Sequence, residues 1–142
     1  MPGFKKLAKA FLSGRDDELK MDADRKTGPR GENIAVSFLE EQGYTVLARN
    51  YRQRFGEIDI VAEELGVLVF VEVKTRKNDR YGNPFEAVDI RKQRKLSRMA
   101  QDYISRNNKE DCAARFDVVA IRLNQESSPE VELVRNAFDF QE

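Results

Sequence analysis

Hydrophobic and polar positions recur along the chain with two different periods, and each change of period predicts where an element begins or ends. Residues 31–42 carry apolar side chains at helical spacing, and Gly43 is expected to end that helix. Residues 89–105 show a second helical stripe. Strands are predicted at residues 44–51, 57–62, 67–74, 115–123 and 131–137. The order α-β-β-β-α-β-β predicts an α/β fold in which helices flank a mixed β-sheet.

Residues 1–28 are expected to form a charged N-terminal tail, separate from a folded domain over residues 29–142. Apolar side chains recur in this tail at helical spacing, with lysines between them: Phe4, Leu7, Ala8, Phe11 and Leu12. The pattern allows two interpretations. The tail is either a short, loosely held amphipathic helix with a disordered linker, or a helix that docks on a partner or an anionic surface.

Histidine is absent from the 142 residues, and Cys112 is the single cysteine. This composition excludes Ser-His-Asp and Cys-His catalysis, zinc fingers and histidine metal sites. Chemistry must therefore depend on carboxylates, amines and hydroxyls, and carboxylates prefer hard cations such as Mg²⁺, Mn²⁺ or Ca²⁺. The longest apolar run, residues 67–71, falls far short of the roughly 20 residues of a membrane helix. We therefore expect a soluble cytoplasmic protein without a membrane span.

Two charged residues end the apolar strand predicted at residues 67–74. Side chains of a strand alternate between its faces, which gives one face of valines: Val67, Val69, Val71 and Val73. The other face combines apolar and charged side chains: Leu68, Phe70, Glu72 and Lys74. Glu72 and Lys74 therefore share one side of the strand, about 7 Å apart along it. Such a pair is usually a solvated salt bridge, so its meaning depends on what faces it.

The preceding strand also carries charged residues on one face. Alternation places Ile58 and Ile60 on one side, and Glu57, Asp59 and Val61 on the other. A hairpin loop at residues 65–66 would place Asp59 directly opposite Glu72. A shift of one residue would instead place Glu57 opposite Glu72 and leave Asp59 diagonal. Either register brings two or three carboxylates together where the strands end.

The first predicted helix supplies a further acid, Glu32. It shares its helical stripe with Ala35, Val36 and Leu39. A charge beside a buried stripe costs several kcal/mol unless it is paired or bound to a metal. Glu32 is therefore a candidate site residue.

Several acids around one lysine suit the hydrolysis of a phosphodiester. Asp59 and Glu72, with the Val73 carbonyl, can hold a Mg²⁺ or Mn²⁺ ion that neutralises the scissile phosphate and lowers the pKa of a bound water. Lys74 can orient or deprotonate that water, or stabilise charge that develops on the phosphate. Glu32 can position the metal through a water or bind a second ion.

Basic residues are concentrated between Lys74 and Arg98, although the net charge of the chain is zero. A segregated basic surface can bind phosphates even on a neutral molecule. The candidate nucleic-acid contacts are Arg76, Arg80, Lys92, Arg94 and Lys95. For the lysines and arginines of the second helix, a solvated face is an equally good interpretation. Asp117 interrupts an apolar strand, and we expect it to pair with a basic group and to have no catalytic role.

Short motifs follow one another over about residues 28–123: Gly31-Glu32, Gly43-Tyr44, RNYR at 49–52, GEID at 56–59, FVEVKTR at 70–76, Tyr81-Gly82, Lys92 and RFDV at 115–118. In this combination they resemble the YraN family of bacterial predicted nucleases. The resemblance implies a restriction-endonuclease-like, Holliday-junction-resolvase-like core of the PD-(D/E)xK type. It also implies Glu32, Asp59, Glu72 and Lys74 as the site. Ile58 stands where the signature has proline, a residue that serves backbone shape and not chemistry.

The favoured hypothesis is a Mg²⁺- or Mn²⁺-dependent endonuclease that cuts branched or distorted DNA by recognising backbone structure. One alternative is a nucleic-acid-binding module that keeps a nuclease-like fold without cleavage, which the complete set of acids and Lys74 disfavours. Another is a protein-interaction adaptor that acts through the N-terminal tail. DNA is favoured over RNA, and a homodimer would suit the cutting of two strands.

Overall fold

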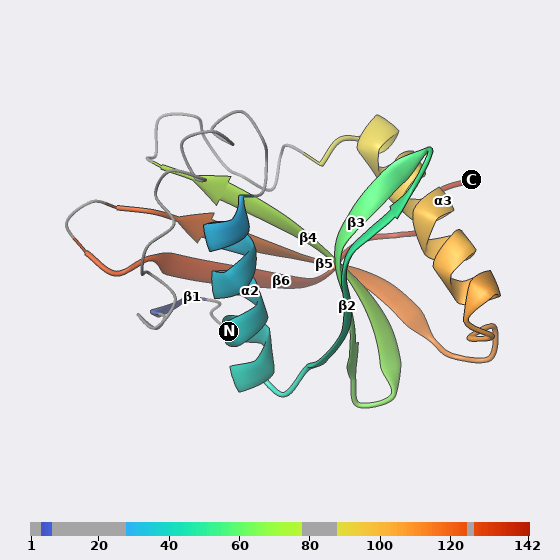
Figure 1. The fold of residues 1–142 in the computed structure, drawn as a ribbon, viewed down its shortest axis with the longest axis horizontal. Helices are drawn as coiled ribbons and strands as arrows, with labels where there is room; N and C mark the ends of the chain where they lie inside the picture. The colour runs from blue at the N-terminus through green and yellow to red at the C-terminus, as the bar shows by residue number, and fades with distance from the viewer. Residues whose placement is uncertain (1–3, 7–27, 78–87, 125–126) are drawn as a thin grey trace.

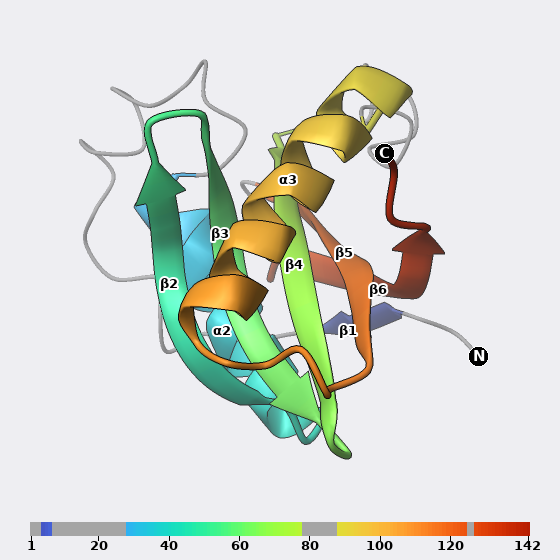
Figure 2. The ribbon, with the colours of Figure 1, turned by 90° about the vertical axis from the view of Figure 1, so that its right-hand side faces the viewer.

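The computed structural model describes residues 4–6, 28–77, 88–124 and 127–142. A six-stranded mixed sheet has the strand order β1-β6-β5-β4-β3-β2. Helix α2 (Pro29–Glu41) covers one face of the sheet and helix α3 (Ile90–Arg106) covers the other (Figures 1 and 2). The predicted α/β class, with helices flanking a mixed sheet, is confirmed. Neither of these helices is long and apolar enough to cross a membrane.

The predicted element order α-β-β-β-α-β-β is also confirmed, with strand bounds that differ by a few residues. The strands are β2 (Thr45–Gln53), β3 (Gly56–Glu64), β4 (Val67–Arg76), β5 (Ala114–Arg122) and β6 (Glu130–Phe138). A short strand, β1 (Phe4–Lys6), pairs with β6 at the sheet edge, where the sequence favoured a helix. Residues 7–27 of the tail, and with them most of the predicted amphipathic helix, lie outside the described residues.

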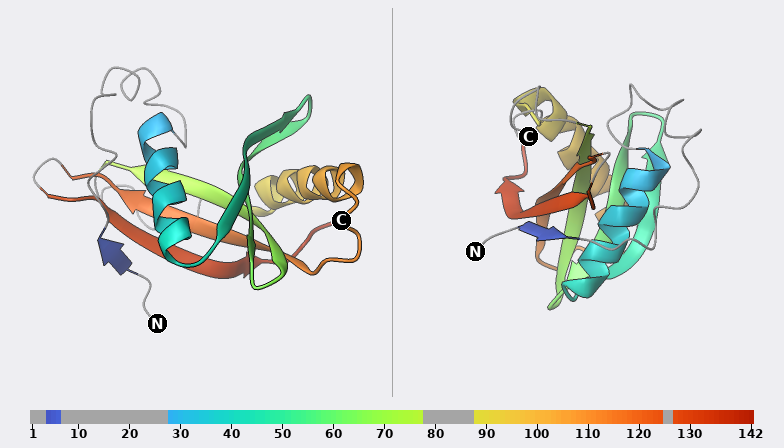
Figure 3. Two further views of the ribbon diagram at one scale, coloured as in Figure 1. Left: turned by 60° about the horizontal axis from the view of Figure 1, so that its bottom comes forward. Right: turned by 90° about the vertical axis from the view of Figure 1, so that its left-hand side faces the viewer.

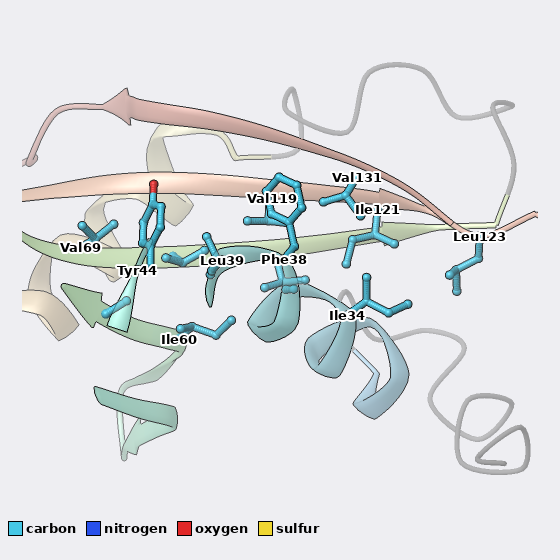
Figure 4. Packing of buried hydrophobic residues seen from close by; sticks show 14 residues of the cluster. Ile34, Phe38, Leu39, Tyr44, Ile60, Val69, Val119, Ile121, Leu123 and Val131 are labelled. Atoms are coloured by element: carbon cyan, nitrogen blue, oxygen red, sulfur yellow. The ribbon is translucent and has the colours of Figure 1, made fainter. Parts of the chain in front are cut away.

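Strand β4 divides the interior into two clusters, as its alternation predicts. Val69, Val71 and Val73 belong to the cluster under α2, whereas Leu68 and Phe70 belong to the cluster under α3. Figure 4 shows the α2 side, where the apolar stripe of the helix packs against side chains from the sheet. Each such large apolar side chain contributes roughly 1.5–3 kcal/mol to stability through its burial. This burial fixes β4, and with it Glu72 and Lys74, between the two helices.

The β3–β4 hairpin has the first of the two registers considered from the sequence. Glu64 pairs with Val67, and the two loop residues Leu65 and Gly66 both have positive φ, 50° and 80°. Such values are those of a type I′ turn, which suits the twist of an antiparallel hairpin. Continuing this register places Asp59 in line with Glu72.

The two strands separate beyond the pair of Ile60 and Val71, and the β2–β3 hairpin swings away from β4 (Figures 1 and 3). We call this separation the fork. Ile58 packs under α3 while Ile60 packs under α2, so the prediction that they share a face is wrong. Strict alternation holds only for a regular strand, and β3 changes direction here. Its neighbour β2 is irregular at the same level, where Asn50 has a φ of 54°.

Candidate functional site

Asp59 lies at the base of the fork, next to Ile60. The residue is 1% exposed, and its Oδ2 accepts the backbone N–H of Val73 at 2.8 Å. In a continued ladder, Val73 would lie opposite Ile58. A side-chain carboxylate thus bridges β3 and β4 where their main-chain ladder ends, and this hydrogen bond fixes where the carboxylate lies.

Glu72 and Lys74 project from the same side of β4, as the alternation predicts, and the structure shows that this side faces α3. The Nζ of Lys74 lies 3.5 Å from Oε2 of Glu72, and both side chains are almost fully buried. A second ammonium reaches the same oxygen from α3, which crosses in front of β3 and β4 in Figure 2. The Nζ of Lys92 lies 3.3 Å from Oε2 of Glu72. The site therefore has one carboxylate between two lysines, contributed by a strand and a helix.

Glu32 lies on the other side of the fork, on the first turn of α2. It is 6% exposed, and its carboxylate accepts hydrogen bonds from Nδ2 of Asn50 at 2.8 and 3.1 Å. The Nε of Arg49 adds an ion pair at 3.4 Å. Asn50 lies between Arg49 and Tyr51, which pair with Ile60 and Ile58 on either side of Asp59. Asn50 and Arg49 of β2 thus offset the free-energy cost of burying the Glu32 carboxylate. The same contacts hold Glu32 near the level of Asp59.

Close packing holds the start of α2 against the end of β4. A Cβ atom added to Gly31 would lie 2.3 Å from Oγ1 of Thr75, a distance that real contacts do not show. Position 31, next to Glu32, must therefore be glycine, because β4 leaves no room there for a side chain. This contact sets the distance between the helix that holds one acid and the strand that holds another.

The oxygen ligands that the sequence predicted for a hard divalent cation are present only in part. Asp59 and Glu72 stand at the same level in a continued β3–β4 register, and with the Val73 carbonyl they offer the oxygen ligands that Mg²⁺ and Mn²⁺ prefer. However, among the described residues no three acidic, histidine or cysteine side chains gather closely enough to hold a metal. A metal would therefore depend on this pair and on backbone and water oxygens, with Glu32 outside the direct set.

The predicted nucleic-acid contacts differ in how exposed their side chains are. Arg76 is partly buried at the end of β4, where its Nη1 donates to the Thr75 carbonyl at 3.2 Å. Arg94 and Lys95 are exposed on α3, whereas Lys92 is turned into the site. Arg80 lies outside the described residues. The exposed face of α3 is thus one described part of the basic segment that a ligand can reach.

Two site contacts could not be seen in the sequence. Asn50 binds Glu32, and Lys92 binds Glu72. In each pair the two residues belong to different elements, so their contact depends on how those elements pack. One signal pointed to Lys92: the first turn of α3 carries no acidic residue, although acids are favoured there. Such a helix start suits a negatively charged partner.

Asp117 has the structural role that was predicted for it. The residue is fully buried and pairs with Nε of Arg115 at 2.9 Å, while the Tyr44 hydroxyl donates to it at 2.6 Å. Burial, together with the hydrogen bond to Asp117, raises the pKa of Tyr44 well above its ordinary value. Arg115 also binds Glu64 at 2.6 Å, so this network ties β5 to the closed end of the β3–β4 hairpin.

Comparison with known proteins places the whole site inside one family region. The model of "Uncharacterised protein family UPF0102" matches residues 31–121. A UPF0102 protein of Symbiobacterium thermophilum is 48% identical over 114 residues, which are 80% of this chain and 97% of the relative. One of Pelobacter propionicus is 51% identical over 118 residues, 82% and 84% of the two chains. One of Trichlorobacter lovleyi is 47% identical over 117 residues, 82% and 92% of the two chains.

Proposed function

We propose that this chain, which belongs to the uncharacterised protein family UPF0102, the YraN family, is a divalent-metal-dependent DNA endonuclease of the PD-(D/E)xK type. One observation carries the proposal: Asp59, Glu72 and Lys74 are all buried where β3 and β4 separate. Apolar residues of similar size would stabilise the core at least as well as buried charges. A cluster of buried charges at one point therefore supports a chemical role.

A Mg²⁺ or Mn²⁺ ion held by Asp59, Glu72 and the Val73 carbonyl would neutralise the scissile phosphate and lower the pKa of a bound water. Asp59 is positioned in advance by its hydrogen bond from the Val73 N–H. The Lys74 ammonium can orient the attacking water and stabilise the charge that develops on the phosphate. Glu32, across the fork, can position a water at the edge of the site.

The substrate class follows from the type of side chain available to contact it. Arg94 and Lys95 are exposed on α3 beside the site, and both are ligands of phosphate groups. Phosphate contacts position a nucleic acid without reading its base sequence. We therefore favour recognition of backbone shape, as in branched or distorted DNA.

Cleavage assays with defined substrates test the proposal. Labelled duplex, single-stranded, flapped and four-way-junction DNA are incubated with the full chain in Mg²⁺, Mn²⁺ or EDTA. We expect cutting that needs the metal and that favours the branched substrates. Asp59→Asn and Lys74→Met should each lower the rate by about 100-fold or more, since each removes a charge that acts on the transition state.

Glu64→Gln is the matched control, because it removes one charge from a partly buried ion pair at the far end of the hairpin. This variant should cut at the wild-type rate wherever it remains folded. Metal-dependent binding of DNA without cutting of any substrate would instead support a binding module. Equal cutting by the wild type and both site variants would refute the assignment.

A further inference from the structure

The two lysines that share Glu72 differ in where they come from and in how buried they are. Lys74 belongs to the same strand as Glu72 and its side chain is 6% exposed. Lys92 comes from α3, and its side chain is 28% exposed. Lys74 is therefore enclosed in the site, whereas Lys92 joins the buried carboxylate to the protein surface.

Lys92 occupies a position where a cation is normally unfavourable. It lies in the first turn of α3, and its backbone N–H donates to the capping side chain of Asp89 at 2.9 Å. The helix dipole places partial positive charge at this end, which disfavours a lysine unless an anion faces it. The Asp89 carboxylate caps the backbone of this helix start, and Glu72 is the anion that faces the Lys92 ammonium. The partnership of Lys92 and Glu72 thus offsets an electrostatic cost of the helix start.

We propose that Lys92 is a built-in counter-cation: it neutralises Glu72 in the metal-free protein, and it becomes available to a substrate phosphate when Glu72 binds a divalent cation. This inference rests on the metal site of the proposed function. A divalent cation and the Lys92 ammonium, which lies 3.3 Å from Oε2 of Glu72, would both draw on the same carboxylate, and like charges so close repel each other. The partial exposure of Lys92 gives its side chain access to solvent and to the basic face of α3.

The consequence is that metal binding and nucleic-acid binding support each other. Without metal, Lys92 shares the negative charge of Glu72 with Lys74 and is held against that carboxylate, so it adds less to phosphate binding. With metal, the positive charge of Lys92 is released for the phosphate. Coupling of this kind is reciprocal, so the nucleic acid should also raise the affinity for the metal.

Removing the charge of Lys92 should therefore raise the affinity for a divalent cation and lower the affinity of the metal-bound protein for nucleic acid. Titration calorimetry of the full-length chain with Mn²⁺ alone should show roughly tenfold tighter binding to Lys92→Gln than to the wild type. Lys92→Arg keeps the charge and should stay within about threefold of the wild type. Arg94→Gln is the control, because it removes an equal charge from the exposed face of the same helix. Solvent screens that charge, so the Mn²⁺ affinity should stay within about twofold.

Binding to a labelled four-way junction supplies the second readout, measured by fluorescence anisotropy in Ca²⁺ and in EDTA. The wild type should gain affinity in Ca²⁺, and Lys92→Gln should lose most of that gain while matching the wild type in EDTA. Arg94→Gln should lose affinity equally in both conditions, since its charge is available throughout.

The outcomes separate this inference from the proposed activity. Equal or weaker Mn²⁺ binding by Lys92→Gln overturns the inference even if the wild type cuts DNA. Tighter Mn²⁺ binding by Lys92→Gln, together with loss of its Ca²⁺-dependent gain in junction affinity, upholds it even if no substrate is cut, in which case the nuclease proposal alone fails. A wild type that binds no Mn²⁺ overturns both. Thermal unfolding of each variant confirms that the compared proteins are folded.

Discussion

The Asp59 carboxylate accepts the backbone N–H of Val73 at 2.8 Å, so a side chain closes the β3–β4 ladder at the point where the strands part. This contact serves the fold and the site together. It satisfies a buried backbone donor, whose loss would cost free energy. It also fixes one carboxylate of the proposed metal pair before any ligand binds.

Substitutions of Asp59 should separate these two roles. Asp59→Ala leaves the Val73 N–H without its acceptor and should lower the free energy of unfolding by about 1–3 kcal/mol. Asp59→Asn keeps a side-chain oxygen for that N–H and should cost less. Both variants should lose Mn²⁺ binding, because the carboxylate is removed in each. Urea unfolding and calorimetry test this, and equal destabilisation by both variants would contradict a role in the ladder.

The contact between Gly31 and Thr75 predicts a coupled pair of substitutions. Gly31→Ala forces a Cβ against Oγ1 of Thr75 and should destabilise the protein by about 1–3 kcal/mol. That hydroxyl is buried without a hydrogen bond among the described residues, so Thr75→Ala should cost little. The double variant should therefore be more stable than the sum of the single effects, by about 1 kcal/mol.

Thr75→Ser provides the control for this cycle, since it retains Oγ1 and should not rescue Gly31→Ala. Additive effects of Gly31→Ala and Thr75→Ala in urea unfolding would show that the helix start moves away instead. Because Glu32 follows Gly31 directly, such a movement would also alter the position of that acid relative to the fork.

Regular elements and their faces could be predicted from the sequence, and contacts between elements could not. Alternation placed Glu72 and Lys74 on one face of β4 with Leu68 and Phe70, and this held because that strand is regular and buried on both faces. The same rule failed at Ile58, because β3 changes direction at the fork. Asn50, which binds Glu32, and Lys92, which binds Glu72, come from other elements, and packing selects them among many polar and charged residues. Composition still limited the chemistry, since a chain without histidine must use carboxylates and lysines.

In the turn between β3 and β4, Leu65 adopts a backbone conformation that is unfavourable for leucine. Leu65 has a φ of 50° and is 95% exposed. A left-handed conformation costs most residues that carry a Cβ roughly 1–2 kcal/mol, and asparagine tolerates it better. Leu65→Asn should therefore raise the free energy of unfolding by about 0.5–1 kcal/mol in urea denaturation, without a change in cleavage. Leu65→Ala retains the Cβ and should gain less, and a loss of stability in Leu65→Asn would contradict the assigned turn.

Glu64 should make stability depend on pH in the acid range. Burial alone would raise the pKa of this carboxyl, but hydrogen bonds from Arg135 and Arg115 outweigh burial and lower the pKa below its ordinary value. The folded protein therefore holds the proton less tightly than the unfolded chain does. The resulting stabilisation is present above the ordinary glutamate pKa and is lost as the pH falls through the lowered one.

Glu64→Gln should consequently be less stable than the wild type at pH 7, by about 1–2 kcal/mol, because two arginines lose their charged acceptor. The difference should narrow as the pH is lowered from about 5 to about 3, since protonation then removes the same charge from the wild type. Glu130→Gln removes an exposed charge that lies 3.8 Å from Arg122, and it should change stability little at either pH. A constant difference between Glu64→Gln and the wild type across this range would mean that packing, and not the ion pairs, accounts for the contribution of Glu64.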